Sequence, residues 1–350
     1  MAGVQQPTQE RVSYRASLIG TIQSHLAGLQ GYDVMALELI QNADDARADS
    51  LIFDITDEGL YVSNSGKFSY CGNLADDPCP LSIGGKSGCD FHRITEVASG
   101  GKLLQSENIG RFGIGFVSSY QVTDRPEIRS TGVRLILDPV GESVIEPYSQ
   151  AKGTTFFLPW ATDPDSKARK KLGSPMTVEL IDQLAEDFQV VLRKGLLFLR
   201  HLRKAEVRRN GQLQLGCELT RPDKSTLRIQ FHPDRSIERW HILECNAKAA
   251  AEQLCKKFPS LISLNRSTQI SIGLRMEPAP LTQGYLYAYL PTEQATGLPL
   301  HINADFFPEA DRKTLIFSGH QHSQAWNEML VDVAATEIAR EPEALLEILV

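Results

Sequence analysis

Two short stretches of the sequence carry residues whose types and spacing are suited to chemistry. In the first, Glu38, Asn42 and Asp45 follow one another at intervals of four and three residues. A helix advances about 100° per residue, so these three positions fall within about 60° of one another and share one stripe of its surface. Solvated helix faces usually mix charge signs and contain lysine, and Asn and Asp are weak helix formers. The stripe is therefore a candidate wall of a cleft, with an ordinary solvated face as the alternative.

The second stretch, "IGRFGIGF", is a glycine-rich box that could bind an anion. It places glycine at Gly110, Gly113 and Gly115, directly before a segment capable of forming a helix. Glycine lets a ligand approach the backbone closely, and N–H groups that precede a helix are natural donors to an anion. Tight turns also need glycine, so a purely structural role is the alternative.

The composition narrows the class of protein that these stretches could serve. The chain has 350 residues, of which 42% are hydrophobic and 23% charged, and this favours a folded protein of two domains. A net charge of -7 does not indicate binding to nucleic acid. No apolar run reaches the roughly 20 residues that cross a bilayer, and the first residues lack the apolar core of a secretory signal. We therefore expect a cytoplasmic protein that has no membrane partner.

Hydrophobic periodicity predicts the elements that must position the two stretches. A hairpin is predicted around the turn Asp57-Glu58-Gly59, residues 69–109 are predicted to form a long mobile loop, and residues 161–175 contain Pro, Gly, Ser and a basic run. We place a linker at 166–175, between a domain at 1–165 and a second at 176–350. The other predicted elements are helices at 14–30, 33–48, 177–202, 246–258 and 323–340, and strands at 126–131, 133–138, 153–160, 205–209, 213–218, 226–231, 268–275 and 283–290. This mixture predicts an α+β fold.

The order of these motifs resembles that of a known family. The acidic-amide helix is followed by a hairpin ending in "SNSG", a glycine-rich loop, the glycine box and "GTTFFLPW", all within the first 160 residues. This succession resembles the GHKL ATPases, which include the ATP-hydrolysing component of DNA gyrase, the 90-kilodalton heat-shock chaperones, histidine kinases and the mismatch-repair protein MutL. The resemblance implies an N-terminal Bergerat α/β sandwich, with a mixed, mainly antiparallel sheet that helices cover on one face.

The resemblance also assigns roles to the polar stripe. It implies that Glu38 is the general base that activates the attacking water and that Asn42 supplies an amide oxygen to magnesium, with Asp45 and Ala46 completing the motif. Magnesium keeps several waters and takes few protein oxygens beside phosphates, which agrees with a single amide ligand. The implied ligands are ATP and magnesium.

The second family motif is where the sequence departs from the pattern. Asn64 stands where the family has the Asp that reads adenine, Gly66 matches the first glycine, and Phe68 replaces the second. The carbonyl oxygen of an Asn can still accept a hydrogen bond from an adenine amino group. Adenine therefore remains the expected base, with altered affinity or base preference.

The remaining family motifs are implied to hold the phosphates and the base. A lid is expected at about 82–109, from which Lys86 would reach the nucleotide, and Thr154 of the final motif is expected to fix the base through water. The glycine box would surround the phosphates with Gly110, Arg111, Phe112, Gly113, Ile114, Gly115 and Phe116.

The later sequence narrows the resemblance to one branch. "ELIQNADDA", "GLPLHINADFFPEADRKTL" and "WNEML" are similar to the repeated chaperone-like region of sacsin and related large proteins, which implies an α/β transducer-like second domain. In better-known GHKL proteins a cation from that domain contacts the γ-phosphate, and Arg312 and Lys313 are the candidates here. A solvated turn with two ordinary basic residues is the alternative.

Three functions stay open on the sequence. The first is slow, magnesium-dependent ATP hydrolysis that drives lid and domain closure, with ATP and ADP, client proteins or partner domains, and a second copy of the chain as partners. The second is a nucleotide-binding interaction module with little or no hydrolysis, which the altered adenine motif favours. The third, a histidine kinase, is disfavoured because no phosphoacceptor helix precedes residue 30. The final "EPEALLEILV" stops inside a helical pattern, so we expect the N-terminal part of a longer protein.

The six cysteines form no CxxC pair, which argues against a zinc ribbon or a disulfide framework. Cys71, Cys79, Cys89 and His92 fall close together in the sequence, but at loose spacing. Reduced thiols are the favoured interpretation, and a metal cluster is the alternative.

Overall fold

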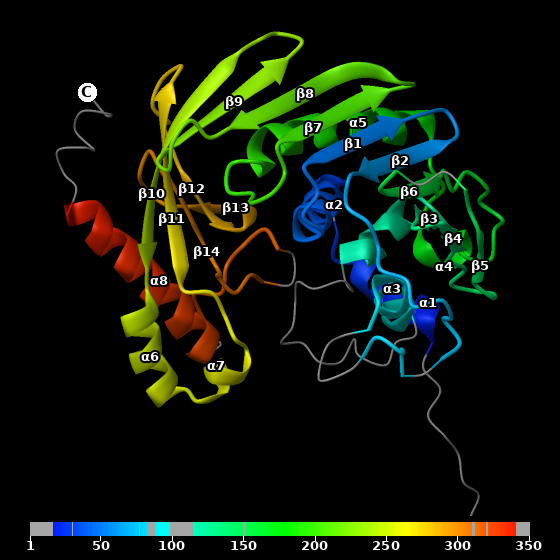
Figure 1. The fold of residues 1–350 in the computed structure, drawn as a ribbon, viewed down its shortest axis with the longest axis horizontal. Helices are drawn as coiled ribbons and strands as arrows, with labels where there is room; N and C mark the ends of the chain where they lie inside the picture. The colour runs from blue at the N-terminus through cyan, green and yellow to red at the C-terminus, as the bar shows by residue number, and fades with distance from the viewer. Residues whose placement is uncertain are drawn as a thin grey trace, which may run out of the picture.

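One large mixed sheet organises the whole fold (Figure 1). The structure is a computed structural model that describes residues 17–29, 31–76, 78–82, 88–98, 115–149, 152–309, 312–319 and 321–340. Within them, 14 strands form a single sheet in the order β13-β12-β14-β11-β10-β9-β8-β7-β1-β2-β6-β3-β4-β5. The predicted α+β class is confirmed. None of the described helices is long and apolar enough to cross a membrane.

The strands of the first part form one end of the sheet. The predicted hairpin is confirmed, because β1 and β2 pair antiparallel with Leu51 opposite Asn64 and Ile55 opposite Leu60. β6 pairs with β2, which brings Thr154 opposite Asn64. The strands are β1 (Ser50–Ile55), β2 (Gly59–Asn64), β3 (Glu127–Ser130), β4 (Val133–Ile136), β5 (Val144–Pro147) and β6 (Thr154–Pro159).

The strands of the second part continue the same sheet. β7 pairs with β1 in parallel, with Phe53 opposite Val207, so the two parts share a ladder of backbone hydrogen bonds. The sequence patterns missed four strands, β5, β10, β13 and β14, which are short, exposed or irregular in their alternation. The strands are β7 (Lys204–Arg209), β8 (Gln212–Thr220), β9 (Thr226–His232), β10 (Ile237–Asn246), β11 (Gln269–Glu277), β12 (Tyr285–Ala288), β13 (Leu290–Ala295) and β14 (His301–Ala304).

Helices α2 and α5 pack against β1, β7 and β8 in the middle of the sheet, α6 and α8 lie beside β10 and β11, and α1 and α4 pack on each other at the opposite end of the molecule (Figure 1). The five predicted helices are confirmed, with ends shifted by a few residues. The helices are α1 (Leu18–Leu26), α2 (Asp33–Asp45), α3 (Asp90–Ala98), the 3₁₀-helix η1 (Gly115–Gln121), α4 (Arg169–Leu172), α5 (Val178–Gly195), α6 (Lys248–Lys257), α7 (Ser260–Ser263) and α8 (Gln321–Arg340).

Helix α3 corrects the prediction that residues 69–109 form a loop throughout. Its start is held by distant partners, since the N–H and the hydroxyl of Ser69 donate to the Asp90 carboxylate at 2.8 and 2.7 Å. Phe91 is buried, and its ring centroid lies 5.4 Å from that of Phe68. A helix of this length depends on packing rather than on propensity, which is why periodicity did not indicate it. The rest of the predicted lid, at 83–87 and 99–109, lies outside the described residues.

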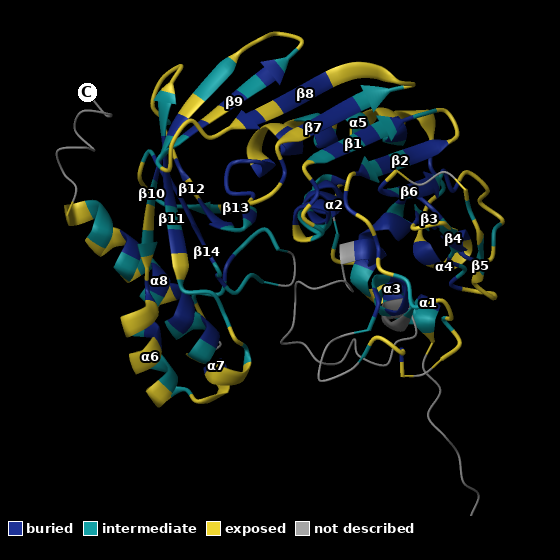
Figure 2. Cartoon of the chain, viewed as in Figure 1, coloured by how far each residue is buried: buried dark blue, intermediate teal, exposed yellow. Residues whose placement is uncertain are grey.

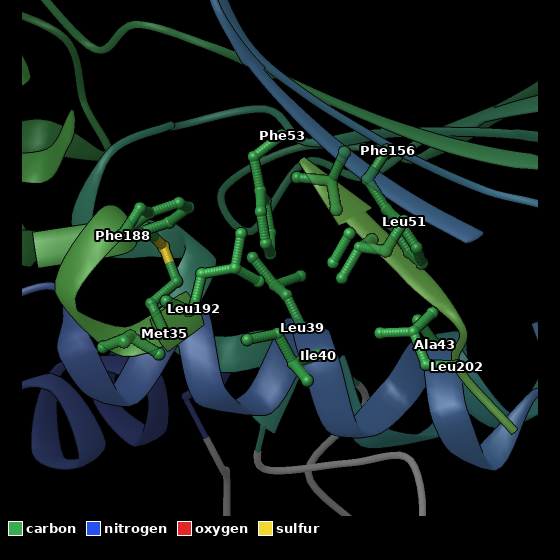
Figure 3. Close-up of a cluster of buried hydrophobic side chains, with 14 of the residues drawn as sticks. Met35, Leu39, Ile40, Ala43, Leu51, Phe53, Phe156, Phe188, Leu192 and Leu202 are labelled. Carbon is green, nitrogen blue, oxygen red and sulfur yellow. The ribbon is translucent and has the colours of Figure 1, made fainter. Parts of the chain in front are cut away.

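Helix α2 lies in the main hydrophobic core (Figure 3). It buries Met35, Leu39, Ile40 and Ala43 against strand β1 and helix α5. The ring of Phe53 on β1 meets that of Phe188 on α5 edge to face at 4.9 Å between centroids. Because β1 and α5 both pack against the apolar face of α2, the helix cannot rotate, and this fixes the direction in which the polar stripe points.

The core and the sheet continue across the predicted linker. Within 166–175, α4 buries Arg169, whose Nε–H donates to Asp124 at 2.9 Å and whose Nη2 donates to the carbonyl of Tyr120 at 2.7 Å. Figure 2 shows buried residues along β1 and β2, which precede the predicted linker in the sequence, and along β7 and β8, which follow it. The boundary between two domains stays a prediction, but the segment itself is docked on the first part.

Burial of His301 predicts a pH dependence of stability. The ring lies between Trp240 and Tyr285, whose N–H donates to Nδ1 at 2.9 Å, and burial lowers the pKa of His301 to about 4. Between that value and its ordinary value near 6.5, the unfolded chain binds a proton that the folded chain does not, so stability falls as the pH falls through this window. We expect a His301-dependent loss of about 2 kcal/mol between pH 7 and pH 4.5.

Urea unfolding of the wild type and of His301→Gln at both pH values measures this loss. Carboxylates contribute equally to both proteins, so the difference between their pH dependences isolates the imidazole. Identical pH dependences of the two unfolding free energies would rule out a buried neutral His301.

Candidate functional site

The polar stripe of α2 passes from the protein interior to its surface. Glu38 is only 5% exposed, Asn42 is half-buried and Asp45 is exposed. All three project from a helix whose opposite face is fixed in the core, so Glu38 and Asn42 lie one turn apart on the same side. The arrangement places a carboxylate and an amide side by side at the edge of the core.

Arg312 from the far end of the sequence forms an ion pair with Glu38, between Nη1 and Oε1. Its loop is held by a bridge between Pro308 and Leu315 and by the Arg312 N–H, which donates to the carbonyl of Glu309 at 3.0 Å. Burial lowers the pKa of Arg312 to about 10. The Arg312 side chain is 20% exposed, and Glu38 supplies the opposite charge that its partly desolvated guanidinium needs.

Lys313 lies beside this pair but contacts different groups. Its ammonium is 2.9 Å from a carboxylate oxygen of Asp33, at the start of α2, and 3.7 Å from Glu293. The hydrogen bond with Asp33 raises the pKa of Lys313. The side chains of Lys313 and Asp33 are both partly exposed, at 28% and 35%. The structure thus separates the two predicted cations, with only Arg312 reaching Glu38.

A cavity of about 200 Å³ opens between the first half of α2 and the second part of the sheet. The polar side chains in its wall are those of Asp33, Glu38, Lys194, Thr292, Glu293, Arg312 and Lys313. A water takes about 30 Å³ of liquid, so the cavity can hold several waters or one phosphate-sized group. The lining therefore combines three carboxylates with a guanidinium and two ammonium groups around a small space, and an anion that enters it must compete with these carboxylates for the cations.

The other end of α2 is fixed by a residue that the motif spacing did not indicate. The buried carboxylate of Asp44 accepts three backbone hydrogen bonds, from the N–H groups of Arg200, His201 and Leu202, at 3.0, 2.7 and 2.9 Å. These three hydrogen bonds attach α2 to the loop that leads into β7. Asp45, which the family motif singled out, is the exposed neighbour. The sequence signal for Asp44 is weak, because adjacent aspartates do not reveal which one points inward.

Asn64, Gly66 and Thr154 meet where β2 ends and β6 begins. The Asn64 side-chain oxygen accepts the N–H of Gly66 at 2.9 Å, and the Thr154 hydroxyl donates to the carbonyl of Gly66, also at 2.9 Å. The Ser130 hydroxyl lies 2.9 Å from that of Thr154 and accepts the N–H of Phe68 at 3.0 Å. Ser130 could not be predicted from the sequence, since nothing in "EIRST" marks it apart from its position on β3.

Ala46 shows where Asn64, Gly66 and Thr154 lie relative to the polar stripe of α2. A Cβ added to Gly66 would lie 3.0 Å from the Cβ of Ala46, so glycine is needed where the loop passes the end of α2. Ala46 and Glu38 are eight residues apart, which corresponds to about 12 Å along a helix. The structure thus places Asn64, Gly66 and Thr154 beside the C-terminal end of α2 and Glu38 with Arg312 near its middle.

The close approach of Gly153 to Asn64 can be tested by substitution. Its φ is +135°, and an added Cβ would overlap the carbonyl oxygen of Asn64. We expect Gly153→Ala to lower the free energy of unfolding by more than the ~1–3 kcal/mol typical of a strained backbone conformation. Chemical denaturation against Gly132→Ala gives the matched control, because Gly132 also has a positive φ, of +80°, but no atom within 4 Å of the added Cβ. Equal costs for the two substitutions would show that the close approach to Asn64 is unimportant.

The glycine box falls largely outside the described residues. Gly110, Arg111, Phe112, Gly113 and Ile114 are not described, and neither is Lys86.

The last two residues of the box are described. Gly115 begins η1, which contacts α2, and the Phe116 ring lies in the core 5.5 Å from that of Phe156. Any contact of Phe116 with a ligand would therefore come from its backbone.

Comparison with known proteins relates this region to one family. Residues 16–151 match the family model described as the Sacsin domain. They are related to that domain. This sacsin-related region includes α1, α2, the β1–β2 hairpin, α3, η1 and strands β3 to β5. It thus contains the polar stripe and the turn at residues 64–66, in which the Asn64 side chain accepts the N–H of Gly66 and which we call the Asn64 turn.

Two curated proteins align with more of the chain. It is 25% identical over 323 residues to "Protein NO VEIN" of Arabidopsis thaliana, an alignment that covers 84% of this chain and 10% of that protein. It is 21% identical over 376 residues to "Sacsin" of Homo sapiens, covering 86% of this chain and 8% of that protein. The chain therefore spans a tenth or less of the length of the curated relatives it matches. Their alignments extend the similarity well past the sacsin-related region.

Proposed function

We propose that this chain binds ATP with magnesium along α2 and hydrolyses it slowly, as a chaperone-like conformational switch of the GHKL type. In this proposal the sacsin-related region and β6 form the Bergerat sandwich, and the part from α5 onward acts as the transducer. Lid and domain closure would follow nucleotide binding. Protein clients, partner domains or a second copy of the chain would respond to that closure.

One observation carries the proposal, namely the alignment of two polar groups along a single helix. Asn64, Gly66 and Thr154 lie beside the end of α2, and Glu38 with Arg312 lies about 12 Å back along it. That separation is of the order of the length of a nucleoside triphosphate. The base would bind beside Asn64, and the γ-phosphate would lie near Glu38.

The charges near Glu38 suit phosphoryl transfer, which depends mainly on positioning and on neutralising charge. Asn42, half-buried one turn from Glu38, would hold magnesium through its amide oxygen, and the ion would offset the charge of the phosphates. Arg312 is half-buried and pairs with Glu38, so a γ-phosphate would compete with the carboxylate for the guanidinium. Release of Glu38 from that pair would free it to orient the attacking water.

The same ion pair favours the second candidate, a nucleotide-binding module that does not hydrolyse. While Arg312 neutralises Glu38, the carboxylate is a poor base, and Asn64 replaces the family Asp. Such a module would bind ATP through the Asn64 end alone. Turnover of the Glu38 variant distinguishes the two candidates.

ATP binding itself can be tested at Thr154, with Thr155 as a matched control. The buried Thr154 hydroxyl bonds to Gly66 and Ser130, whereas the half-buried Thr155 hydroxyl bonds to Ser63 at 3.0 Å. Calorimetric titration with ATP and magnesium is expected to show a roughly 3–10-fold weaker affinity for Thr154→Val, the effect of about one hydrogen bond, and no comparable change for Thr155→Val. Absence of ATP binding by the wild type at millimolar nucleotide would reject the proposal.

A further inference from the structure

Three cysteines and one histidine converge next to the Asn64 turn without a role in the site described above. The ligand atoms of Cys71, Cys79, Cys89 and His92 all lie within 4.8 Å of one another. Cys79, Cys89 and His92 are buried and Cys71 is half-buried. Two of the four come from the loop after β2, and the other two lie one turn apart at the start of α3.

We propose that Cys71, Cys79, Cys89 and His92 bind one zinc ion in a closed, structural Cys₃His site. Tetrahedral zinc with bonds of ~2.3 Å to sulfur and ~2.0 Å to nitrogen places its ligand atoms about 3.5–3.8 Å apart. His92 Nδ1 is already 3.3 Å from the Cys71 sulfur and 3.2 Å from the Cys89 sulfur. Closing the widest separation needs a side-chain shift of only about 1 Å.

The histidine is oriented as a metal ligand. Its Nε2 lies 2.9 Å from the carbonyl oxygen of Asp76, and because a carbonyl only accepts, Nε2 carries the proton. The lone pair of Nδ1 therefore points at the sulfurs. A backbone carbonyl that holds the far ring nitrogen is a usual partner of a metal-bound histidine.

The backbone around the cluster is shaped for thiolate sulfur. The N–H of Cys89 donates to the Cys79 sulfur at 3.3 Å, and the N–H of His92 donates to the Cys89 sulfur at 3.4 Å. Gly88 allows the two segments to approach, since an added Cβ would lie 2.8 Å from the Cβ of Cys79. These donors stabilise negative charge on sulfur, which zinc ligation requires.

Four soft ligands and no oxygen donor favour zinc over magnesium or calcium. The competing state is a cluster of reduced thiols, in which the Cys71 thiol donates to the carbonyl of Asn73 at 3.1 Å. In that state the Cys89 thiol can donate to Nδ1 of His92 at 3.2 Å, so metal content is the measurement that separates the two states. Zinc accounts for all four side chains at once.

The site would connect the Asn64 turn to α3. The chain between Gly66 and Cys79 otherwise depends on a few contacts, including Ser69 with Asp90 and Tyr70 with the Phe91 ring. A zinc ion bonded to both segments would make the position of α3 depend on metal. This role is independent of ATP binding, so it stands or fails separately from the proposed function.

Metal analysis of the full 350-residue chain, purified without an affinity tag, tests the proposal. We expect about one zinc per chain by mass spectrometry of the metal, retained through dialysis. Cobalt(II) in place of zinc should give the intense ligand-field bands of a tetrahedral site and the charge-transfer bands of thiolate ligands. Less than about a tenth of an equivalent after reconstitution with zinc, or one equivalent of iron, would overturn it.

Single substitutions separate a ligand from a core residue. Cys89→Ser and His92→Ala should lose zinc, and the control Cys255→Ser, on α6, should keep about one equivalent. His92→Cys offers four thiolates and should restore binding, a result that a merely packed histidine does not explain. Circular dichroism confirms the folding of each variant, and zinc retention by folded His92→Ala, or its absence from folded His92→Cys, would contradict the site.

Discussion

Replacing Glu38 by Gln is expected to lower steady-state phosphate release by about 10²–10⁴-fold while changing the ATP dissociation constant only a few-fold. The substitution keeps the shape of the side chain but removes the carboxylate that would orient and deprotonate the attacking water. The effect on turnover exceeds the effect on binding because a general base acts on the reacting water and not on the nucleotide. Phosphate release with magnesium and calorimetric ATP titration measure the two quantities.

Glu186→Gln is the control for this experiment, because Glu186 is an exposed carboxylate on α5 that does not line the cavity. It should leave phosphate release unchanged within about twofold. Equal and negligible rates in the wild type and in Glu38→Gln, with ATP still bound, would instead support the binding module. An equal, substantial rate in both proteins would assign hydrolysis to a different residue.

Replacing Arg312 by Ala is expected to destabilise the nucleotide-free protein by about 3–5 kcal/mol. Arg312 is the ion-pair partner of Glu38, and its removal leaves a buried carboxylate without a compensating charge. Urea unfolding should therefore show a large loss for Arg312→Ala and a recovery of part of it in the double variant with Glu38→Gln. Additive effects of the two substitutions would show that the pair is not coupled.

The same substitution should also reduce phosphate release, since the guanidinium lines the cavity in which the proposed γ-phosphate would bind. Lys313→Ala provides the matched comparison one residue away. Its partly exposed pair with Asp33 predicts a loss of only about 0–1 kcal/mol and a small effect on turnover. If both variants hydrolyse ATP at the wild-type rate with normal affinity, neither cation serves the reaction.

The sequence predicted the candidate site best where the signal was local. Helical spacing placed Glu38 and Asn42 on one side of α2, and the turn residues 57–59 correctly predicted the β1–β2 hairpin. Both features depend on residues a few positions apart, which share one element whatever the rest of the chain does. The same spacing did not reveal that Asp44 turns inward and accepts hydrogen bonds from the loop before β7, and the role of Asp45 stays a prediction.

Elements held by distant partners could not be predicted in the same way. Helix α3 is anchored by Ser69 and by the Phe68 ring, and α4 by the burial of Arg169, neither of which appears in a periodicity. The loose spacing of the cysteine cluster favoured reduced thiols over a metal site. Its one compact pair, Cys89 and His92 three residues apart, becomes meaningful only once the loop after β2 folds over the start of α3.

The sequence by itself determined the polar stripe, most of the helices and strands, and the α+β class, because side-chain periodicity and turn chemistry act over a few residues. Only the tertiary structure decided which groups meet. The β2–β6 register set Asn64 against Thr154, and long-range packing of the last strands and loops carried Arg312 onto Glu38. Such pairings join residues that are far apart in the sequence, and the physical reason is that they follow from strand register and long-range packing rather than from any local preference.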